Sequence, residues 1–185
     1  MRSKATASSD METHIYSFPP IADTESLVLI LGSMPGKASL KAHEYYAHPK
    51  NAFWRIIASL GNTAPDSSYE SRVDMLISTK IALWDVLASC TRKSSLDADI
   101  VAASITANDF LSFYSAHPKI VLVFFNGAHA EASYKKHVLP VLGRKFEHLK
   151  YQRLPSTSPA HASLSFEQKL QVWRAGFESL TSSSN

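Results

Sequence analysis

Cysteine is nearly absent from this chain of 185 residues, in which the one example is Cys90. This excludes an internal disulfide bond and a zinc or iron–sulfur site with four thiolate ligands, and it points to a reducing compartment. Long apolar runs are missing as well. None approaches the roughly 20 residues that a helix needs to cross a bilayer, so we expect no membrane partner.

Positive charge is in only slight excess: 19 Lys and Arg against 16 Asp and Glu give a net charge of +3. This balance allows a nucleic-acid partner, and it fits an ordinary, slightly basic protein equally well. Metal-binding patterns are also lacking, because His43 and His48, or His129 and His137, do not have the i, i+4 spacing of a helical site and have no Cys or Glu in ligand register. We expect no metal ion and no other cofactor.

The apolar residues that are present gather in four short runs without alternation, which is typical of strands buried on both faces of a parallel sheet. Helical patterns separate these runs. The expected strands are 27–31, 81–86, 120–125 and 149–154, and the expected helices are 52–60, 68–78, 108–116, 128–138 and 165–180. The alternation predicts a single-domain three-layer α/β/α fold with a central, mainly parallel four-stranded sheet.

The two ends of the chain differ from this pattern. Residues 1–16 are expected to be a disordered tail, since the first ten are rich in Ser and lack the apolar core of a secretory signal. The domain should then span 17–181, opening with an extended segment at 17–21 whose prolines disfavour helix. Residues 182–185 are expected to fray.

In an open parallel sheet, ligands bind beyond the carboxyl ends of the strands, so the loops after the four runs form the expected site. The first of them contains Gly32-Ser33-Met34-Pro35-Gly36. Met34 stands where a nucleophile elbow has Ser, and the Lys of a phosphate-binding loop is absent. Either the backbone N–H groups of this loop face a ligand and stabilise negative charge, or the loop is a plain turn.

Four side chains in these loops have both a functional and a structural interpretation. Tyr46 could stack on a base or belong to the core. Asn51 could be merely the cap of the helix at 52–60, and Asn126 could simply satisfy a turn. His161 could meet a phosphate or a base, or lie in solvent.

Taken jointly, the motifs resemble the uracil-DNA glycosylase superfamily over residues 18–180. The Gly32–Gly36 loop, followed by Tyr46-Ala47-His48-Pro49-Lys50-Asn51-Ala52-Phe53-Trp54, is similar to the first motif region of the mismatch-specific uracil and thymine glycosylases. The branch called hypoxanthine-DNA glycosylase, or family six, is the most similar one, on the segments 32–36, 83–86, 95–97, 125–127 and 154–160.

Three positions depart from the family pattern. Met34 replaces the catalytic Asn of the mismatch-specific enzymes, and a thioether is too weak an acceptor to orient water. The family-six resemblance instead implies Asn51 as the catalytic residue. His161 stands where that branch more often has Asn, and Ser94 stands where Gly is expected, which puts the role of His161 and the shape of the loop at 92–95 in question.

The resemblance implies a monofunctional DNA glycosylase that flips a deaminated purine out of DNA and hydrolyses its N-glycosylic bond. It implies a base pocket and a DNA-binding loop. The base pocket would contain Tyr46, Asn126, Gly32, Ser33 and Met34, and the DNA-binding residues would be Ser156, Thr157, Ser158, Ala160 and His161, with Ala160, His161 or Leu164 filling the gap left in the duplex.

The expected partner is double-stranded or single-stranded DNA with a deaminated base. The protein is expected to be a monomer. Its expected location is the cytoplasm (the bacterial nucleoid) or, in a eukaryote, the nucleus. Alternatives remain: a uracil or xanthine glycosylase of the same fold, or a lesion-binding module without catalysis. A flavodoxin-like nucleotide-binding protein is disfavoured, because no Gly-rich loop could cradle phosphates.

Overall fold

The structure is a computed structural model that describes residues 13–61 and 67–181. Its central sheet contains β2 (Val28–Gly32), β3 (Ile81–Asp85), β6 (Leu122–Asn126) and β7 (Lys150–Leu154). The strand order is β3-β2-β6-β7, and every neighbouring pair is parallel. The predicted parallel sheet is confirmed, with each strand end within two residues of its expected position.

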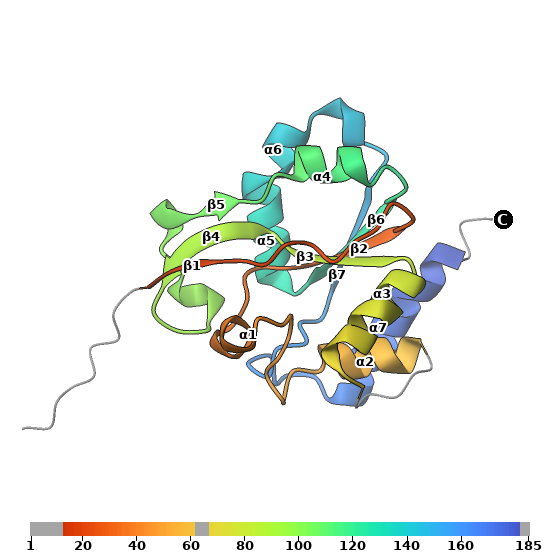
Figure 1. Cartoon of the computed structure of the whole chain (residues 1–185), viewed down its shortest axis with the longest axis horizontal. Coiled ribbons are helices and arrows are strands. Elements are labelled where there is room, and N and C mark those ends of the chain that lie inside the picture. Colours follow the sequence, from red (N-terminus) through yellow and green to blue (C-terminus); the bar gives the residue numbers. More distant parts are fainter. Residues whose placement is uncertain (1–12, 62–66, 182–185) are drawn as a thin grey trace, which may run out of the picture.

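Helices cover both faces of this sheet (Figure 1). One face carries α2 (Phe53–Leu60), α3 (Tyr69–Ser78) and α7 (Phe166–Thr181), and the other carries α4 (Phe110–Ala116), α5 (Ala128–His137) and α6 (Leu139–Leu142). Successive residues of a strand face opposite sides, so Ile30 packs into the first layer and Leu31 into the second. This is the predicted three-layer architecture.

The helix ends follow local rules where the sequence shows them. At the start of α7, Ser165 and Gln168 form a reciprocal capping box: the Ser165 N–H donates to Gln168 Oε1 at 2.8 Å, and the Gln168 N–H donates to Ser165 Oγ at 3.2 Å. Two buried residues then anchor α7 to the loop before it, because Trp173 and Lys169 both donate hydrogen bonds to that loop.

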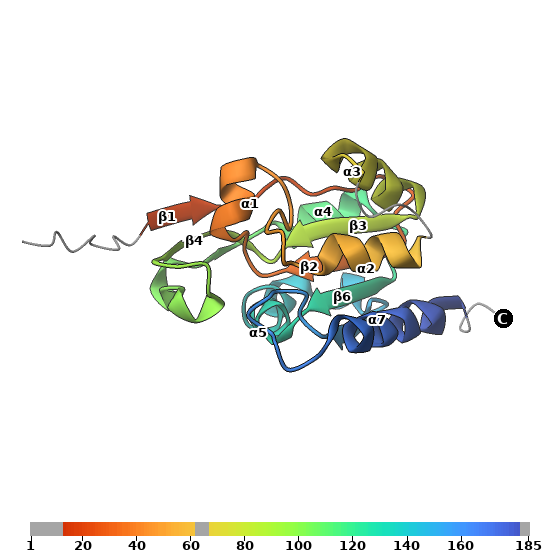
Figure 2. The ribbon, with the colours of Figure 1, turned by 90° about the horizontal axis from the view of Figure 1, so that it is seen from below.

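A second, antiparallel sheet was not predicted. It has the order β1-β4-β5, formed by β1 (Thr13–Tyr16), β4 (Leu87–Arg92) and β5 (Thr106–Ala107). Only Val86 separates β4 from β3, so the small sheet lies just beyond the carboxyl ends of the large one, as Figure 2 shows.

This sheet corrects two predictions. Thr13–Tyr16 were assigned to a disordered tail, but they pair with Ser89–Arg92 in β4. Arg92 was placed in the loop at 92–95, but it ends β4. The extended segment at 17–21 is confirmed, and Ile21 forms a bridge with Leu83 on the outer edge of β3. The remaining tail predictions, at 1–12 and 182–185, lie outside the described residues.

The other connections contain short helices: α1 (Lys37–Ala42), η1 (Asp97–Asp99), η2 (Ala102–Ser104) and η3 (Arg144–Phe146). Across 13–61 and 67–181, no helix is both long and apolar enough to cross a membrane.

Candidate active site

The carboxyl ends of the four parallel strands surround a cavity of about 170 Å³. This is smaller than the roughly 300–1,000 Å³ of clefts that hold drug-sized ligands, and it suits a ligand of about the size of one base. All the residues predicted for catalysis and base binding line it, namely Gly32, Ser33, Met34, Tyr46, Asn51 and Asn126. A larger cavity of about 1,080 Å³ opens at the opposite end of the sheet, and none of these residues borders it.

Tyr46 forms one wall of the cavity. Its backbone has a φ of +54°, in the left-handed region, which turns the chain so that the ring lies against Phe53. The two rings are stacked with centroids 4.1 Å apart. One face of Tyr46 is therefore covered by the core. Its hydroxyl oxygen is buried without a hydrogen-bond partner among the described residues, and burial raises the pKa of this phenol well above its usual range.

Asn51 lies where the chain enters α2, and its side chain both caps the helix and lines the cavity. Its Oδ1 accepts the N–H of Phe53 at 2.9 Å, so the side chain caps the helix. Its own N–H donates to the carbonyl of His48 at 2.8 Å. These bonds fix the amide on the wall of the cavity, with a second Oδ1 lone pair still available for water.

Asn126 ends β6, and its amide is bonded twice to Thr157. Nδ2 donates to Thr157 Oγ1 at 2.9 Å, and Oδ1 accepts the Thr157 N–H at 2.8 Å. Thr157 is 1% exposed. Its hydroxyl and its N–H are both used to hold Asn126, and the contact of Thr157 with DNA stays a prediction. Asn126 also lines the cavity beside Tyr46, and its amide has one further N–H and one further lone pair.

The Gly32–Gly36 loop is held from the side by the segment that follows β4. Ser33 Oγ donates to Asp97 Oδ1 at 2.7 Å, and the N–H of Lys37 donates to Ser95 Oγ at 2.9 Å. The buried guanidinium of Arg92 donates to the carbonyl of Pro35. Met34 is buried and packs into the core as well as bordering the cavity. The loop is thus a fixed part of the site and more than a plain turn.

Asp85 was not recognised as a site residue. It ends β3 opposite Gly32 and is 3% exposed, and it lines the cavity. A Cβ on Gly32 would clash with its carboxylate and lie 2.9 Å from Tyr46 Oη, so only glycine fits between these groups. The signal in the sequence was a carboxylate closing an otherwise apolar strand, at the sheet edge where ligands bind.

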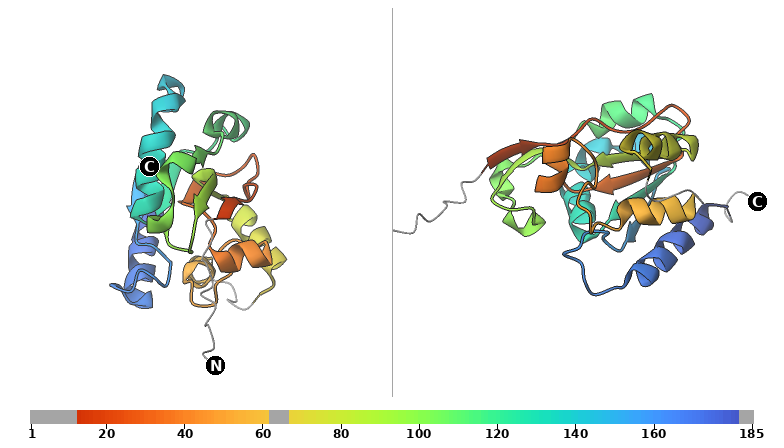
Figure 3. Two further views of the ribbon diagram at one scale, coloured as in Figure 1. Left: turned by 90° about the vertical axis from the view of Figure 1, so that its left-hand side faces the viewer. Right: turned by 60° about the horizontal axis from the view of Figure 1, so that its bottom comes forward.

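The loop between β7 and α7 closes the site on another side, and Figure 3 shows it passing beside the chain that enters α2. Ser156 and Ser158 border both the cavity and an adjoining cleft of about 630 Å³. The exposed Ala160 and the partly exposed His161 line only the cleft. The cleft continues from the cavity to the surface, so these residues are placed at its outer part.

Two side chains of α7 fix this loop from behind. Lys169 is 5% exposed, and its Nζ donates to the carbonyl of His161 at 2.7 Å and to that of Ser158 at 3.4 Å. Trp173 Nε1 donates to the carbonyl of Pro155 at 2.9 Å. Neither residue was predicted, because a lysine and a tryptophan in an amphipathic helix look like ordinary surface and core positions.

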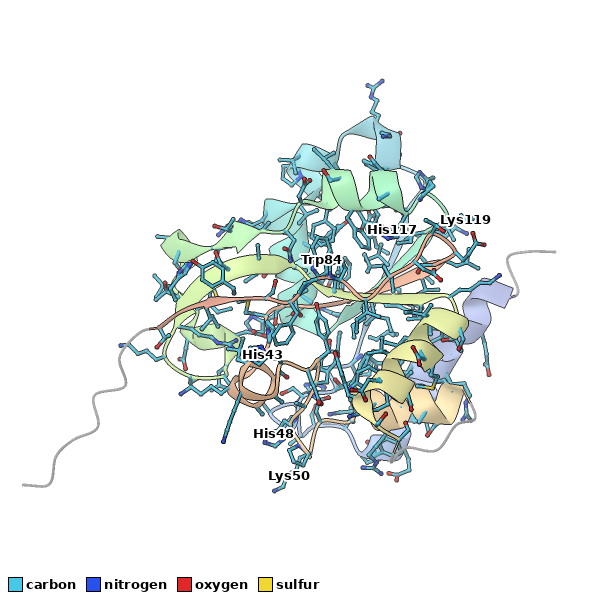
Figure 4. All side chains as sticks on the ribbon, in the orientation of Figure 1. His43, His48, Lys50, Trp84, His117 and Lys119 are labelled. Carbon is cyan, nitrogen blue, oxygen red and sulfur yellow. The ribbon has the colours of Figure 1, made fainter. Side chains whose placement is uncertain are left out.

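Basic side chains lie at the rim. Lys37 and His48 are exposed and border the cavity, and Figure 4 shows His48 and Lys50 on the loop that precedes α2. Such a rim suits a polyanion. Among the residues the structure describes, no three His, Cys, Asp or Glu side chains are grouped so that they could hold a metal ion.

Comparison with known proteins agrees with this geometry. A 162-residue stretch, 86% of this chain, is 35% identical to a hypoxanthine DNA glycosylase of Methanosarcina acetivorans and covers 96% of that protein. A protein of the same name from Methanosarcina barkeri is 40% identical over 111 residues, which are 60% of this chain and 69% of the relative.

A solved structure and a family model match most of the chain as well. A solution NMR structure of a Methanosarcina acetivorans protein assigned to the uracil DNA glycosylases superposes with a TM-score of 0.71 at 31% identity, covering 88% of this chain and 98% of that one. The model of the uracil DNA glycosylase superfamily matches residues 19–176. The chain therefore belongs to the uracil DNA glycosylase superfamily.

Proposed function

We propose that the chain is a hypoxanthine-DNA glycosylase, a hydrolase that removes hypoxanthine from deoxyinosine in DNA. The observation that supports this most directly is that Tyr46, Asn51 and Asn126 meet in one cavity of base size at the carboxyl edge of the sheet. The two Methanosarcina relatives that carry this name are similar to most of the chain, which favours hypoxanthine among the possible bases.

The reaction begins with extrusion of the nucleotide, since the glycosylic bond is inaccessible inside a duplex. Unstacking costs a few kcal/mol, and stacking of the base on the free face of Tyr46 offsets about 1–3 kcal/mol of it. The hydroxyls of Ser156 and Ser158 hold the backbone, and Ala160 or His161 enters the space left in the duplex.

Hydrolysis then needs a positioned water and a stabilised leaving base. In this proposal Asn51 holds the water through the lone pair of Oδ1 that the helix cap leaves unused. Because the amide is already immobilised, little side-chain conformational entropy is lost when water binds. A neutral amide suffices, since an oxocarbenium-like transition state is attacked without a strong base.

Base recognition is assigned to the remaining groups of Asn126. Hypoxanthine offers an acceptor at O6 and a donor at N1, which match one amide N–H and one amide lone pair. Thr157 holds that amide in a single orientation, because exchanging its N and O ends would set the Nδ2 donor against the N–H donor of Thr157. Adenine presents the opposite pair of groups and is disfavoured by this orientation.

The proposed working form is a monomer without metal or redox cofactor, acting where the chromosome lies, in the bacterial cytoplasm or in a eukaryotic nucleus. Its substrate is double-stranded or single-stranded DNA that contains the deaminated base.

The test is an incubation of the protein with end-labelled duplexes containing inosine, uracil, xanthine or no lesion, followed by alkali cleavage of abasic sites. Breaks at inosine support the proposal. Breaks mainly at uracil or xanthine would mean that the protein is a glycosylase for that base. Tight binding without breaks would identify a lesion-binding module.

A further inference from the structure

Asp85 is a buried acid in the cavity that the proposed reaction does not yet use. Its Oδ2 is buried and has no hydrogen-bond partner among the described residues, and the same is true of the neighbouring Tyr46 Oη. Buried polar atoms in native proteins are nearly always paired, so two unpaired atoms beside one cavity indicate groups that meet a ligand.

The groups around Asp85 favour its neutral form. Burial is the main cause, and the negative charge of Asp97 acts in the same direction, while the guanidinium of Arg92 opposes both. Together they raise the pKa of Asp85 to about 8. Tyr45 and Tyr46 face it from the segment before α2 and add no positive charge. At pH 7 the carboxyl group therefore keeps its proton.

We propose that Asp85 is the catalytic acid of the reaction, giving its proton to N7 of the departing hypoxanthine. This rests on the proposed function. The base must enter the cavity ahead of its sugar. The sugar stays joined to the DNA, at the exposed rim near His48 and Pro159. In this arrangement the buried Asp85 faces the base, while Asn51 is assigned to the sugar carbon.

The step balances without a further reactant. The C1′–N9 bond breaks and its electron pair passes into the purine ring, while the Oδ2–H bond of Asp85 breaks and an N7–H bond forms. Water adds to C1′ and loses its proton to solvent. The base leaves as neutral hypoxanthine, and the Asp85 carboxylate takes a proton from solvent once the cavity is empty.

Tyr46 does not compete for this role. Burial and the nearby Asp85 raise the pKa of its phenol further, so it holds its proton too tightly to give it to a leaving base. Its hydroxyl is instead suited to bond with Asp85 or with the base.

The experiment measures single-turnover excision of hypoxanthine from a duplex between pH 5.5 and 9.5. In the unaltered protein, the rate constant is expected to fall about tenfold per pH unit above a pH near 8, as the acid ionises. Asp85→Asn keeps the shape of the side chain without the proton. At pH 7 it should be slower by about 10² or more, and its rate should not fall above pH 8.

Asp74→Asn is the matched control, since it makes the same change on the exposed side of α3. It should keep the profile of the unaltered protein. The flat profile of Asp85→Asn on the same duplex also separates ionisation of the enzyme from ionisation of the substrate base. A merely structural role of Asp85 would lower the rate without removing the fall above pH 8.

The inference and the proposed function fail in different ways. If the unaltered protein excises hypoxanthine and Asp85→Asn matches its rate and pH profile, the acid role is overturned and the function stands. An unaltered protein whose rate stays level through pH 9.5 overturns the acid role equally. If the unaltered protein releases no hypoxanthine at any pH, the proposed function itself is wrong.

Discussion

Asn126 and Thr157, which are 31 positions apart, are joined by two hydrogen bonds between the amide of one and the hydroxyl and N–H of the other. The carbonyl of Thr157 also accepts the N–H of Ala52 at 3.0 Å, next to Asn51. One buried threonine thus connects the residue assigned to base recognition with the start of the helix that carries the residue assigned to water.

Thr157→Val tests this connection. Valine has the same shape but no hydroxyl, so Asn126 Nδ2 loses its acceptor while Oδ1 keeps the backbone N–H. We expect hypoxanthine excision to slow by about tenfold, and the preference for hypoxanthine over adenine to weaken, because the amide is less well oriented. Thr157→Ser retains the hydroxyl and should behave like the unaltered protein. Equal selectivity in the valine variant would contradict the orienting role.

Asn51→Ala should keep DNA binding and lose product formation by a factor of about 10² or more, the scale of a lost transition-state contact. The substitution also removes a helix cap, which costs about 0.5–2 kcal/mol of stability. Single-turnover rates and binding anisotropy with an inosine duplex measure the two effects. Asn51→Ser keeps an oxygen for the cap, so a serine variant that is stable but inactive separates the roles. Unchanged turnover in the alanine variant removes Asn51 from the mechanism.

Asp85→Asn should change stability in a pH-dependent way that needs no substrate. The pKa of Asp85 is about 8 in the folded protein, above the ordinary value of 3.8. Between these two pH values the folded protein keeps the proton, whereas the unfolded chain has released it. Stability is full below about pH 4 and declines as the pH rises to about 8, by up to about 1.4 kcal/mol per pH unit.

The asparagine variant has no such group, so its melting temperature should exceed that of the unaltered protein by a margin that widens from pH 4 to 8 and then stays constant. Each kcal/mol corresponds to about 2–4 °C in a chain of this size. Calorimetry or thermal circular dichroism at a series of pH values measures the margin. A margin that is the same at pH 5 and pH 8 would mean that the buried carboxyl is ionised throughout.

Lys169→Met should weaken the DNA-binding loop while sparing the fold. Methionine preserves the apolar stem but leaves the carbonyls of Ser158 and His161 without the ammonium group. We expect binding of an inosine duplex to weaken by about tenfold, with a smaller change in melting temperature. Lys169→Arg, which can still donate to both carbonyls, should recover part of the affinity. Binding that is unaffected by the methionine would show that the loop keeps its shape unaided.

The sequence predicted the large sheet well, because its strands are uninterrupted apolar runs and the helices between them have ordinary stop signals. It did not predict β1 and β5, whose four and two residues are too short for a pattern and acquire their structure only by pairing with β4. β4 itself was hidden because a single residue separates it from β3.

The same distinction applies to the site. Asn51 and Asn126 could be located, since each lies beside a recognisable break: Pro49 precedes Asn51, and Gly127 follows Asn126. Asp85 was missed although it closes an apolar strand at the carboxyl edge of the sheet, and Lys169 could not be located, because a lysine on an amphipathic helix gains its meaning from burial. The burial of Thr157 and its bonds to Asn126 were not predicted for a related reason: its partner is distant in the sequence, and a Ser/Thr-rich loop by itself suggests exposure.

The anchoring of the β7–α7 loop by Trp173 and Lys169 makes the last helix a working part of the site, although no residue described in it borders the base cavity. A shortened protein ending before residue 166 would retain all the side chains assigned to chemistry. It would nevertheless lose the support that sets the spacing between the strand ends and the DNA backbone, so the borders of the catalytic unit extend beyond the residues that touch substrate.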